Sequence, residues 1–297
     1  MVAGQRAARH RRLVAALTVS ALAAAAALTV AVAVARAQEA GIRAPFITTP
    51  DEVVAEMLAL AGTGRDDFVI DLGSGDGRIV IAAAQRFGAR GLGVDLDEEL
   101  VRLSRDNARR AGVAERAEFR VQDALKTDLS HASVVTIYLL PQLISELQPR
   151  VLDGMQPGSR VVTHAFYMQS WKPDAVRKVR LAQRHASQGD ESTIYLWIVP
   201  ANARGEWRAR LPAIGDIELL IRQNFQEIEV EGRADARAFQ VDQAHLRGKA
   251  MRWSGTLELS GRRVEQRFDG LVLPDRIEGE LTIAGQEPVR LVATRAR

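Results

Sequence analysis

Apolar positions between residues 51 and 163 fall into two patterns, short continuous runs and longer stretches with a period near 3.6 residues. The short runs predict buried strands, and the periodic stretches predict amphipathic helices. Together they predict strands at residues 68–72, 91–95, 118–122, 133–139 and 158–163 and helices at residues 51–61, 78–87, 97–111 and 142–153. Strands that alternate with helices at this spacing indicate a doubly wound α/β fold with a mostly parallel sheet.

The helix ends carry local signals. Thr48 and Thr49 precede Pro50, so either threonine is expected to cap the first helix. Gly88 and Gly112 directly follow two of the other helical stretches and are expected to end them.

The alternation of strands and helices stops after the fifth strand. Residues 175–182 and 193–199 form two apolar runs with no helical stretch between them. Two such runs predict an antiparallel hairpin at the edge of the sheet, which brings the expected sheet to seven strands.

A third pattern begins near residue 204. Apolar and polar residues alternate, as in residues 227–231 and 277–283, and glycines separate the runs. This alternation predicts an antiparallel β meander of about 90 residues that forms a half-barrel or a small barrel. We therefore expect an α/β domain at residues 38–200 and an antiparallel β domain at residues 201–297.

The first 37 residues resemble a targeting segment. They contain five arginines and no acid, and Leu13–Ala35 is apolar except for three hydroxyl residues. Ala35-Arg36-Ala37 fits a small-x-small cleavage site, which predicts a signal peptide. The apolar stretch is also long enough to span a bilayer, so an uncleaved N-terminal membrane anchor is the close alternative and a soluble alanine-rich helix a weaker one.

The position of the arginines predicts where the rest of the chain lies. Because four of them precede the apolar stretch, the positive-inside rule places the body across the membrane. We therefore expect a membrane-anchored or exported, extracytoplasmic protein that can associate with a membrane through residues 13–35.

Charge and composition exclude several kinds of site. Residues 38–297 contain 35 basic and 37 acidic side chains with no long basic run, which argues against a nucleic-acid partner. The chain has no cysteine, which excludes disulfides, thiolate zinc sites and a cysteine nucleophile. The histidines show no metal-binding spacing, and no metal is expected.

The stretch IDLGSGDGRIVI, residues 70–81, is a strand, a glycine loop and the start of a helix. A dinucleotide fingerprint G-x-G-x-x-G would need a glycine where Arg78 stands, and no Gly-Lys-Ser/Thr follows as in a P-loop. The spacing Asp71-x-Gly73-x-Gly75-x-Gly77 resembles the first motif of the class I S-adenosylmethionine-dependent methyltransferases. This resemblance implies S-adenosylmethionine as the cofactor, held at the carboxyl ends of the strands.

The chemistry of these residues suits that cofactor. Glycines let the backbone approach a ligand closely, and the following helix start offers free N–H groups. The Asp71 carboxylate would match the positive charges of the cofactor. Asp95 ends the second strand, 22 residues after Gly73, where an acid can accept both ribose hydroxyls. The resemblance also implies that Asp123 lies beside the adenine.

Each acid taken alone fits a helix cap equally well. The three acids together, at the ends of three successive strands and beside the glycine loop, favour a cofactor site. The predicted cofactor-binding residues are Asp71, Gly73, Ser74, Gly75, Gly77, Asp95 and Asp123.

A narrower resemblance covers residues 45 to about 174. Its motifs are PFITTPDEVV from Pro45, DLGSGDGRIVIAAA from Asp71, YLLP from Tyr138 and PGSRVVTH from Pro157. They look like the lysine methyltransferases of the ATP synthase c-subunit type and their bacterial relatives, which implies methylation of a protein lysine.

The C-terminal β module departs from that family's pattern and leaves the acceptor open. A small-molecule or lipid methyltransferase is one alternative. Another is a non-catalytic binding protein whose β module holds a ligand.

Methyl transfer needs alignment more than it needs an acid or a base. The reaction is a direct displacement at an activated carbon, and positioning alone can supply roughly 7–11 kcal/mol. Tyr138 and His164, at the ends of the fourth and fifth strands, are the candidate catalytic residues: the hydroxyl of Tyr138 to orient an amine, and His164 as a base. Packing is the alternative role for each. Phe46 and the Thr48-Thr49-Pro50 turn are candidates to close over the cofactor, and the four tryptophans are expected to be core or domain-interface anchors.

Overall fold

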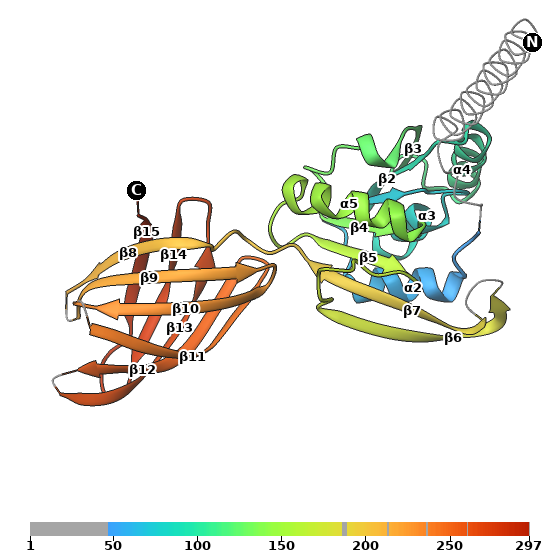
Figure 1. The fold of residues 1–297 in the computed structure, drawn as a ribbon. Coiled ribbons are helices and arrows are strands. Elements are labelled where there is room, and N and C mark those ends of the chain that lie inside the picture. Colours follow the sequence, from blue (N-terminus) through green and yellow to red (C-terminus); the bar gives the residue numbers. More distant parts are fainter. Residues whose placement is uncertain (1–46, 186–188, 213, 236, 260, 297) are drawn as a thin grey trace, which may run out of the picture. The chain divides into compact units, whose positions relative to one another are not determined.

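The computed structural model of the chain describes residues 47–185, 189–212, 214–235, 237–259 and 261–296 (Figure 1). The predicted targeting segment, residues 1–37, and Phe46 lie outside these residues. Within the described ranges, no helix is both long enough and apolar enough to cross a membrane.

An open sheet of seven strands forms the first part, in the order β3-β2-β1-β4-β5-β7-β6. Strands β1 to β5 are parallel, β7 runs antiparallel to β5, and β6 runs antiparallel to β7. The strands are β1 (Phe68–Leu72), β2 (Arg90–Asp95), β3 (Ala117–Val121), β4 (Val134–Ile137), β5 (Arg160–His164), β6 (Ala175–His185) and β7 (Gly189–Ile198). The predicted doubly wound, mostly parallel sheet with a hairpin at its edge is confirmed.

Helices pack on this sheet because neighbouring strand residues face opposite sides. Val69 of β1 belongs to the core beneath α2 and α3, whereas the next residue, Ile70, belongs to the core beneath α5. The helices are α2 (Asp51–Leu60), α3 (Arg78–Phe87), α4 (Glu98–Arg110) and α5 (Pro141–Gly154), with a short 3-10 helix η1 (Ala124–Lys126).

Two of the predicted helix ends are confirmed and one predicted cap is wrong. Gly88 and Gly112 follow α3 and α4 in the left-handed conformation that favours glycine, with φ of 71° and 70°. Helix α2 begins after Pro50, and no side chain caps it. The Thr49 hydroxyl instead lies 3.3 Å from Nδ1 of His164.

The C-terminal part is a closed barrel of eight antiparallel strands. The strands are β8 (Gly205–Leu211), β9 (Gly215–Asn224), β10 (Glu227–Ala234), β11 (Arg237–Arg247), β12 (Ala250–Leu259), β13 (Arg262–Val272), β14 (Arg276–Ile283) and β15 (Val289–Arg295). Each strand pairs with the next in sequence, and β15 pairs back onto β8. The expected meander is therefore a full barrel rather than a half-barrel.

Arg295 strengthens the seam at which the barrel closes. Its guanidinium lies 4.3 Å from the centre of the Trp207 ring on the adjacent strand. The same guanidinium donates hydrogen bonds of 2.6 Å to the carbonyls of Asn202 and Arg204. One side chain thus ties the last strand to the segment that enters the first.

Apolar side chains fill the interior of the barrel. The rings of Trp253 and Phe268 stack with their centroids 4.0 Å apart, and both are buried. Gly270 and Gly279 leave room for Phe268, because a Cβ on either glycine would lie within 3 Å of its Cζ atom. An eight-stranded barrel is just wide enough for such a filling. A lipid-like ligand would need the space that these side chains occupy.

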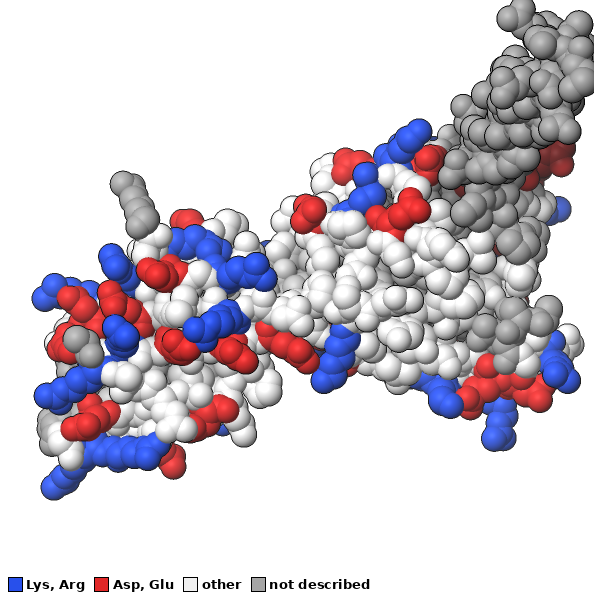
Figure 2. Space-filling model, viewed as in Figure 1, with Lys and Arg blue, Asp and Glu red and all other residues white. Residues whose placement is uncertain are grey.

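Charges of both signs cover the outside of the barrel, and Figure 2 shows them interspersed on the visible face. Arg208 pairs with Glu218 at 3.3 Å, and Arg252 pairs with Asp269 at 2.9 Å, each across neighbouring strands. Such exposed pairs stabilise a fold only slightly. They favour an outer surface that is in contact with water.

The turn between β9 and β10 joins the barrel to the first part of the chain. Phe225 packs against the core beneath α5 and stacks on Trp171, with ring centroids 5.5 Å apart. Gln226 accepts a hydrogen bond of 2.7 Å from Nε1 of Trp171 and donates one of 2.6 Å to the carbonyl of Lys172. All four tryptophans are buried, as the sequence predicts.

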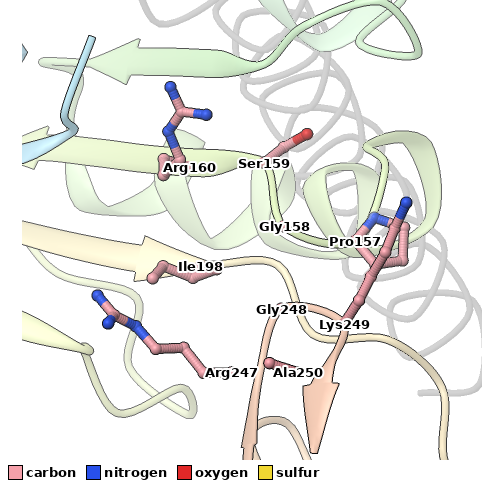
Figure 3. Close-up of a pocket in the computed structure, with 9 residues that line it drawn as sticks. All are labelled: Pro157, Gly158, Ser159, Arg160, Ile198, Arg247, Gly248, Lys249 and Ala250. Carbon is pink, nitrogen blue, oxygen red and sulfur yellow. The ribbon is translucent and has the colours of Figure 1, made fainter. Parts of the chain in front are cut away.

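A second contact comes from the turn between β11 and β12. A Cβ on Gly248 would lie only 2.9 Å from Cα of Gly158, which precedes β5, and an open groove of about 520 Å³ lies beside it (Figure 3). Arg160, which lines this groove, begins β5, whereas the candidate catalytic residue His164 ends the same strand. The groove is therefore separate from the predicted site.

Candidate functional site

The glycine loop curls over the carboxyl ends of β1 and β2. Gly73, Gly75 and Gly77 have φ of 82°, 53° and 82°, a conformation that residues with a Cβ rarely adopt. The N–H of Gly73 donates a hydrogen bond of 2.9 Å to the carbonyl of Val94, which fixes the loop to β2. A Cβ on Gly73 would lie 2.7 Å from Cδ2 of Leu139. The loop thus presents bare backbone where the sequence predicts the cofactor.

Asp95 fixes this loop through hydrogen bonds to its side chain. Its Oδ2 atom accepts a 2.9 Å hydrogen bond from the N–H of Gly75, and its Oδ1 atom accepts one of 3.0 Å from the N–H of Asp97. A carboxylate oxygen has two lone pairs, so both oxygens keep acceptor capacity for a sugar hydroxyl. The next residue, Leu96, is an apolar side chain that is 54% exposed. Its exposure beside Asp95 makes it a further candidate to cover the cofactor, which the sequence reasoning missed.

Asp123 performs the cap role that the sequence left open. Its Oδ1 atom accepts a hydrogen bond of 2.9 Å from the N–H of Leu125 and so caps η1. The preceding residue, Gln122, donates its N–H to the carbonyl of Asp95 at 2.9 Å. This bond links the end of β3 to the end of β2, so capping and a place in the site are compatible for Asp123.

Asp71 is fully buried at the end of β1 and accepts a 2.7 Å hydrogen bond from the Thr136 hydroxyl. Burial raises the pKa of Asp71 to about 7, and the charges of Asp95 and Asp76 act in the same direction. A cation beside Asp71 would therefore favour its ionised form. The Ser74 hydroxyl in the same loop is buried and has no hydrogen-bond partner among the described residues. Such a group fits a ligand that supplies the partner.

Three rings gather on the other side of the loop. Tyr138 directly follows β4 and His164 ends β5, and their ring centroids are 4.1 Å apart. His185, the last residue of β6, lies 5.9 Å from His164 and 6.4 Å from Tyr138. The sequence reasoning missed His185, because it ended this strand at residue 182.

The imidazole of His164 is held on both sides. Its Nε2 atom lies 3.0 Å from the Ser192 hydroxyl, and its Nδ1 atom lies 3.3 Å from the Thr49 hydroxyl. Burial, and to a smaller extent the charge of the nearby His185, lower the pKa of His164 to about 4. His164 is therefore neutral at physiological pH and is a weak base.

All predicted site residues lie at one edge of the sheet, because β1 to β5 are parallel and end on the same side. Leu139 connects the two halves, since it follows Tyr138 in sequence and contacts the position where Gly73 has no side chain. In a doubly wound sheet this edge is where ligands bind. The arrangement can hold a nucleotide-like group on the loop and a second reactant beside Tyr138.

The family model described as the ANTKMT methyltransferase domain matches residues 71–175. A protein-lysine N-methyltransferase of Saccharolobus islandicus is 36% identical over 156 residues, which are 52% of this chain and 93% of the relative. The ATP synthase c-subunit lysine N-methyltransferase of Xenopus laevis is 37% identical over 44% of this chain and 56% of its own length. The adenine nucleotide translocase lysine N-methyltransferase of Mus musculus is 33% identical over 46% of this chain and 58% of its own length.

Among solved structures, an RNA methyltransferase from Salinibacter ruber in complex with S-adenosyl-L-homocysteine is 45% identical, with a TM-score of 0.47. The match covers 52% of this chain and 95% of that one. The chain spans nearly all of the archaeal relative but little more than half of the two vertebrate relatives. The barrel lies beyond the residues that the family model matches.

Proposed function

Because this chain belongs to the S-adenosylmethionine-dependent methyltransferases of the family that includes the archaeal protein-lysine N-methyltransferase, we propose that it methylates the ε-amine of a lysine in a protein. The relatives named for the ATP synthase c-subunit and for adenine nucleotide translocase support a protein acceptor. One observation carries the proposal. The glycine loop, Tyr138 and the neutral ring of His164 all lie at the same edge of the sheet.

The residues of the loop fit S-adenosylmethionine. The bare backbone from Gly73 to Gly77 would lie against it, and Asp95 would accept its ribose hydroxyls. Asp71 would balance its positive charge, and the buried Ser74 hydroxyl would gain a partner. Leu96 and Asp123 would flank its adenine. When bound, this cofactor supplies a methyl group on a positively charged sulfur.

On the acceptor side the chain must receive a lysine that is cationic in water. A lysine amine has a pKa near 10.4 and must lose a proton before it can attack. Removal of the amine from water on entry to the site would disfavour its ammonium form and so lower that pKa, and the lysine would give its proton to the solvent before it attacks. Tyr138 would orient the amine through its hydroxyl. His164 would support the Tyr138 ring, because a group with a pKa near 4 is a poor base at neutral pH.

The experiment that tests this function follows a labelled methyl group. The full chain is incubated with tritiated S-adenosylmethionine and with separated membrane and soluble fractions of cells, and the labelled protein is hydrolysed to amino acids. We expect the label in methyl-lysine, and we expect the Asp95→Ala variant to transfer little of it. The exposed barrel variant Asp269→Asn is the matched control and should transfer at the parent rate.

The other outcomes identify other functions. Label in lipid, in RNA or in small molecules would contradict the lysine proposal and name the acceptor class. No transfer with S-adenosylmethionine bound would favour a non-catalytic binding protein.

We also propose that residues 13–35 bring the chain to a membrane, with its body on the side away from the leading arginines. The composition of this segment and its preceding arginines support the proposal. S-adenosylmethionine is made in the cytosol, so this placement requires the cofactor to reach the far side. A reporter fused after Arg297 should score as extracytoplasmic, and a cytoplasmic score would overturn the proposed orientation.

A further inference from the structure

Arg78 contacts two separate segments of the chain. It is the first residue of α3 and stands where a dinucleotide fingerprint would have its third glycine. Its Nε and Nη2 atoms lie between 2.7 and 3.2 Å from the carboxylate of Asp76, inside the glycine loop. Its Nη1 atom donates a hydrogen bond of 2.9 Å to the carbonyl of Thr49. The planar guanidinium can hold both partners at once, which a lysine amine cannot do with the same geometry.

Asp76 is an integral part of the cofactor loop. It lies between Gly75 and Gly77, both at positive φ, and its own carbonyl accepts a 2.8 Å hydrogen bond from Nδ2 of Asn107 on α4. The neighbouring N–H of Gly75 is held by Asp95. A ligand that orders this loop therefore also orders the Asp76 carboxylate, which accepts the hydrogen bonds of Arg78.

The segment Thr48–Thr49 contacts the acceptor side. Thr49 is only 4% exposed, and its hydroxyl lies beside Nδ1 of His164. The carbonyl of Thr48 lies 3.0 Å from Nε2 of His185. Two residues at the entry to α2 thus touch the two histidine rings that lie beside Tyr138.

An isolated ion pair between Arg78 and Asp76 would contribute little, because the Arg78 side chain is 31% exposed. The bond from Arg78 to Thr49 distinguishes this arrangement from such a pair. It joins segments 29 residues apart in sequence and lies on a continuous series of contacts from Asp76 to His164 and Tyr138.

We propose that Arg78 is a positioning residue that couples the cofactor loop to the Thr48–Thr49 segment and, through it, to the rings of the acceptor pocket. The proposal rests on the proposed function, because it assigns the two coupled sides to cofactor and acceptor. When the loop is ordered by a ligand, Arg78 fixes the Thr49 carbonyl, and the Thr49 hydroxyl then holds His164 against Tyr138. A coupling of this kind requires direct evidence that the two sides respond together.

Hydrogen–deuterium exchange with S-adenosylhomocysteine as the probe supplies that evidence without knowledge of the acceptor. The full chain is compared with Arg78→Gln, Arg78→Lys and the control Arg86→Gln, an exposed arginine on the same helix. At saturating probe we expect exchange in the parent and control to slow at least threefold, both in peptides covering residues 73–77 and in peptides covering residues 48–58. In Arg78→Gln we expect slowing only in residues 73–77, and in Arg78→Lys we expect partial slowing of residues 48–58.

Equal slowing of residues 48–58 in Arg78→Gln and the parent would overturn the coupling while leaving the proposed function intact. Slowing of residues 73–77 alone in the parent would overturn it as well. If S-adenosylhomocysteine slows exchange in neither region of the parent, that result contradicts cofactor binding itself and therefore also the coupling.

A second measurement separates positioning from simple damage. Thr49→Val removes the hydroxyl but keeps the carbonyl that Arg78 grips, and Thr49→Ser keeps both. We expect Thr49→Val to lower the methyl-transfer rate at saturating S-adenosylmethionine at least fivefold with an unchanged affinity for S-adenosylhomocysteine, and we expect Thr49→Ser to restore the rate. Equal rates in the two variants would contradict the role of Thr49.

Discussion

The two sheets of this chain differ in whether their edge strands pair with each other. The seven-stranded sheet is open, and its parallel strands bring glycines, carboxylates and rings to a single edge. The eight-stranded barrel closes on itself, fills its interior with Trp253, Phe268 and other apolar side chains, and places paired charges outside. The open sheet carries buried polar groups such as Asp71 and His164, whereas the barrel interior holds few. The residues proposed to carry the chemistry lie in the part that retains buried polar groups, and the barrel contributes none of them.

The largest expected effect is in the barrel. Trp253→Ala removes a buried ring that stacks on Phe268, and we expect a loss of about 3–5 kcal/mol in the free energy of unfolding. Denaturant titration measures this loss, and Trp253→Phe should lose much less. The rise in melting temperature caused by S-adenosylhomocysteine should match that of the parent, because none of the predicted cofactor-binding residues belongs to the barrel core. A variant that folds but no longer responds to the ligand would break the division of roles.

The next effect is a pH dependence in the open sheet. Folding raises the pKa of Asp71 to about 7, so the folded state binds this proton more tightly than the unfolded state does. Asp71 therefore favours folding most below about pH 4, and this contribution is lost as the pH rises to 7. Relative to Asp71→Asn, the parent should lose about 2–3 kcal/mol of stability between pH 5 and pH 8. Denaturant titrations at both pH values measure the difference.

A difference between parent and Asp71→Asn that is the same at both pH values would contradict the raised pKa. The control is Asp269→Asn, which removes an exposed carboxylate on the barrel and should reproduce the pH dependence of the parent.

The smallest effect concerns the junction of the two parts. Phe225→Ala removes the ring that packs against Trp171 and the core beneath α5, and we expect a cost of about 2 kcal/mol because the ring is only partly buried. The parent should unfold in one transition, and the variant should show the barrel and the α/β part unfolding separately. Tryptophan fluorescence and far-UV circular dichroism together resolve the two transitions. Coincident transitions in the variant would show that the Phe225 contact does not couple the two parts.

Local sequence patterns were sufficient to predict most of the fold. The strand from Phe68 to Leu72 and the helix from Arg78 to Phe87 were predicted to the residue, because a continuous apolar run, a glycine loop and an amphipathic period are all local signals. The alternation after residue 204 predicted an antiparallel meander. The same alternation left a half-barrel and a small barrel as alternatives, because closure depends on pairing between residues far apart in sequence, such as Arg208 of β8 and Thr294 of β15.

The candidate site divides in the same way. Spacing indicated the glycine loop, and the strand ends indicated Asp95 and Asp123. His185 could not be found by this route, because an irregularity in the β6–β7 pairing between Arg180 and His185 carries the strand past its apolar run. The prediction that Thr49 caps α2 is also wrong. Its hydroxyl lies beside His164, which is 115 residues away in sequence and therefore beyond the reach of a local pattern.

The central claim is that the glycine loop binds S-adenosylmethionine, and equilibrium titration of the full chain with S-adenosylhomocysteine tests it most directly. We expect saturable binding at one site. Gly75→Val, which places a branched side chain at positive φ, and Asp95→Ala, which releases the N–H of Gly75, should each weaken binding at least tenfold. Asp269→Asn should bind as the parent does. Absence of binding by the parent, or unchanged affinity in both loop variants, would contradict the account.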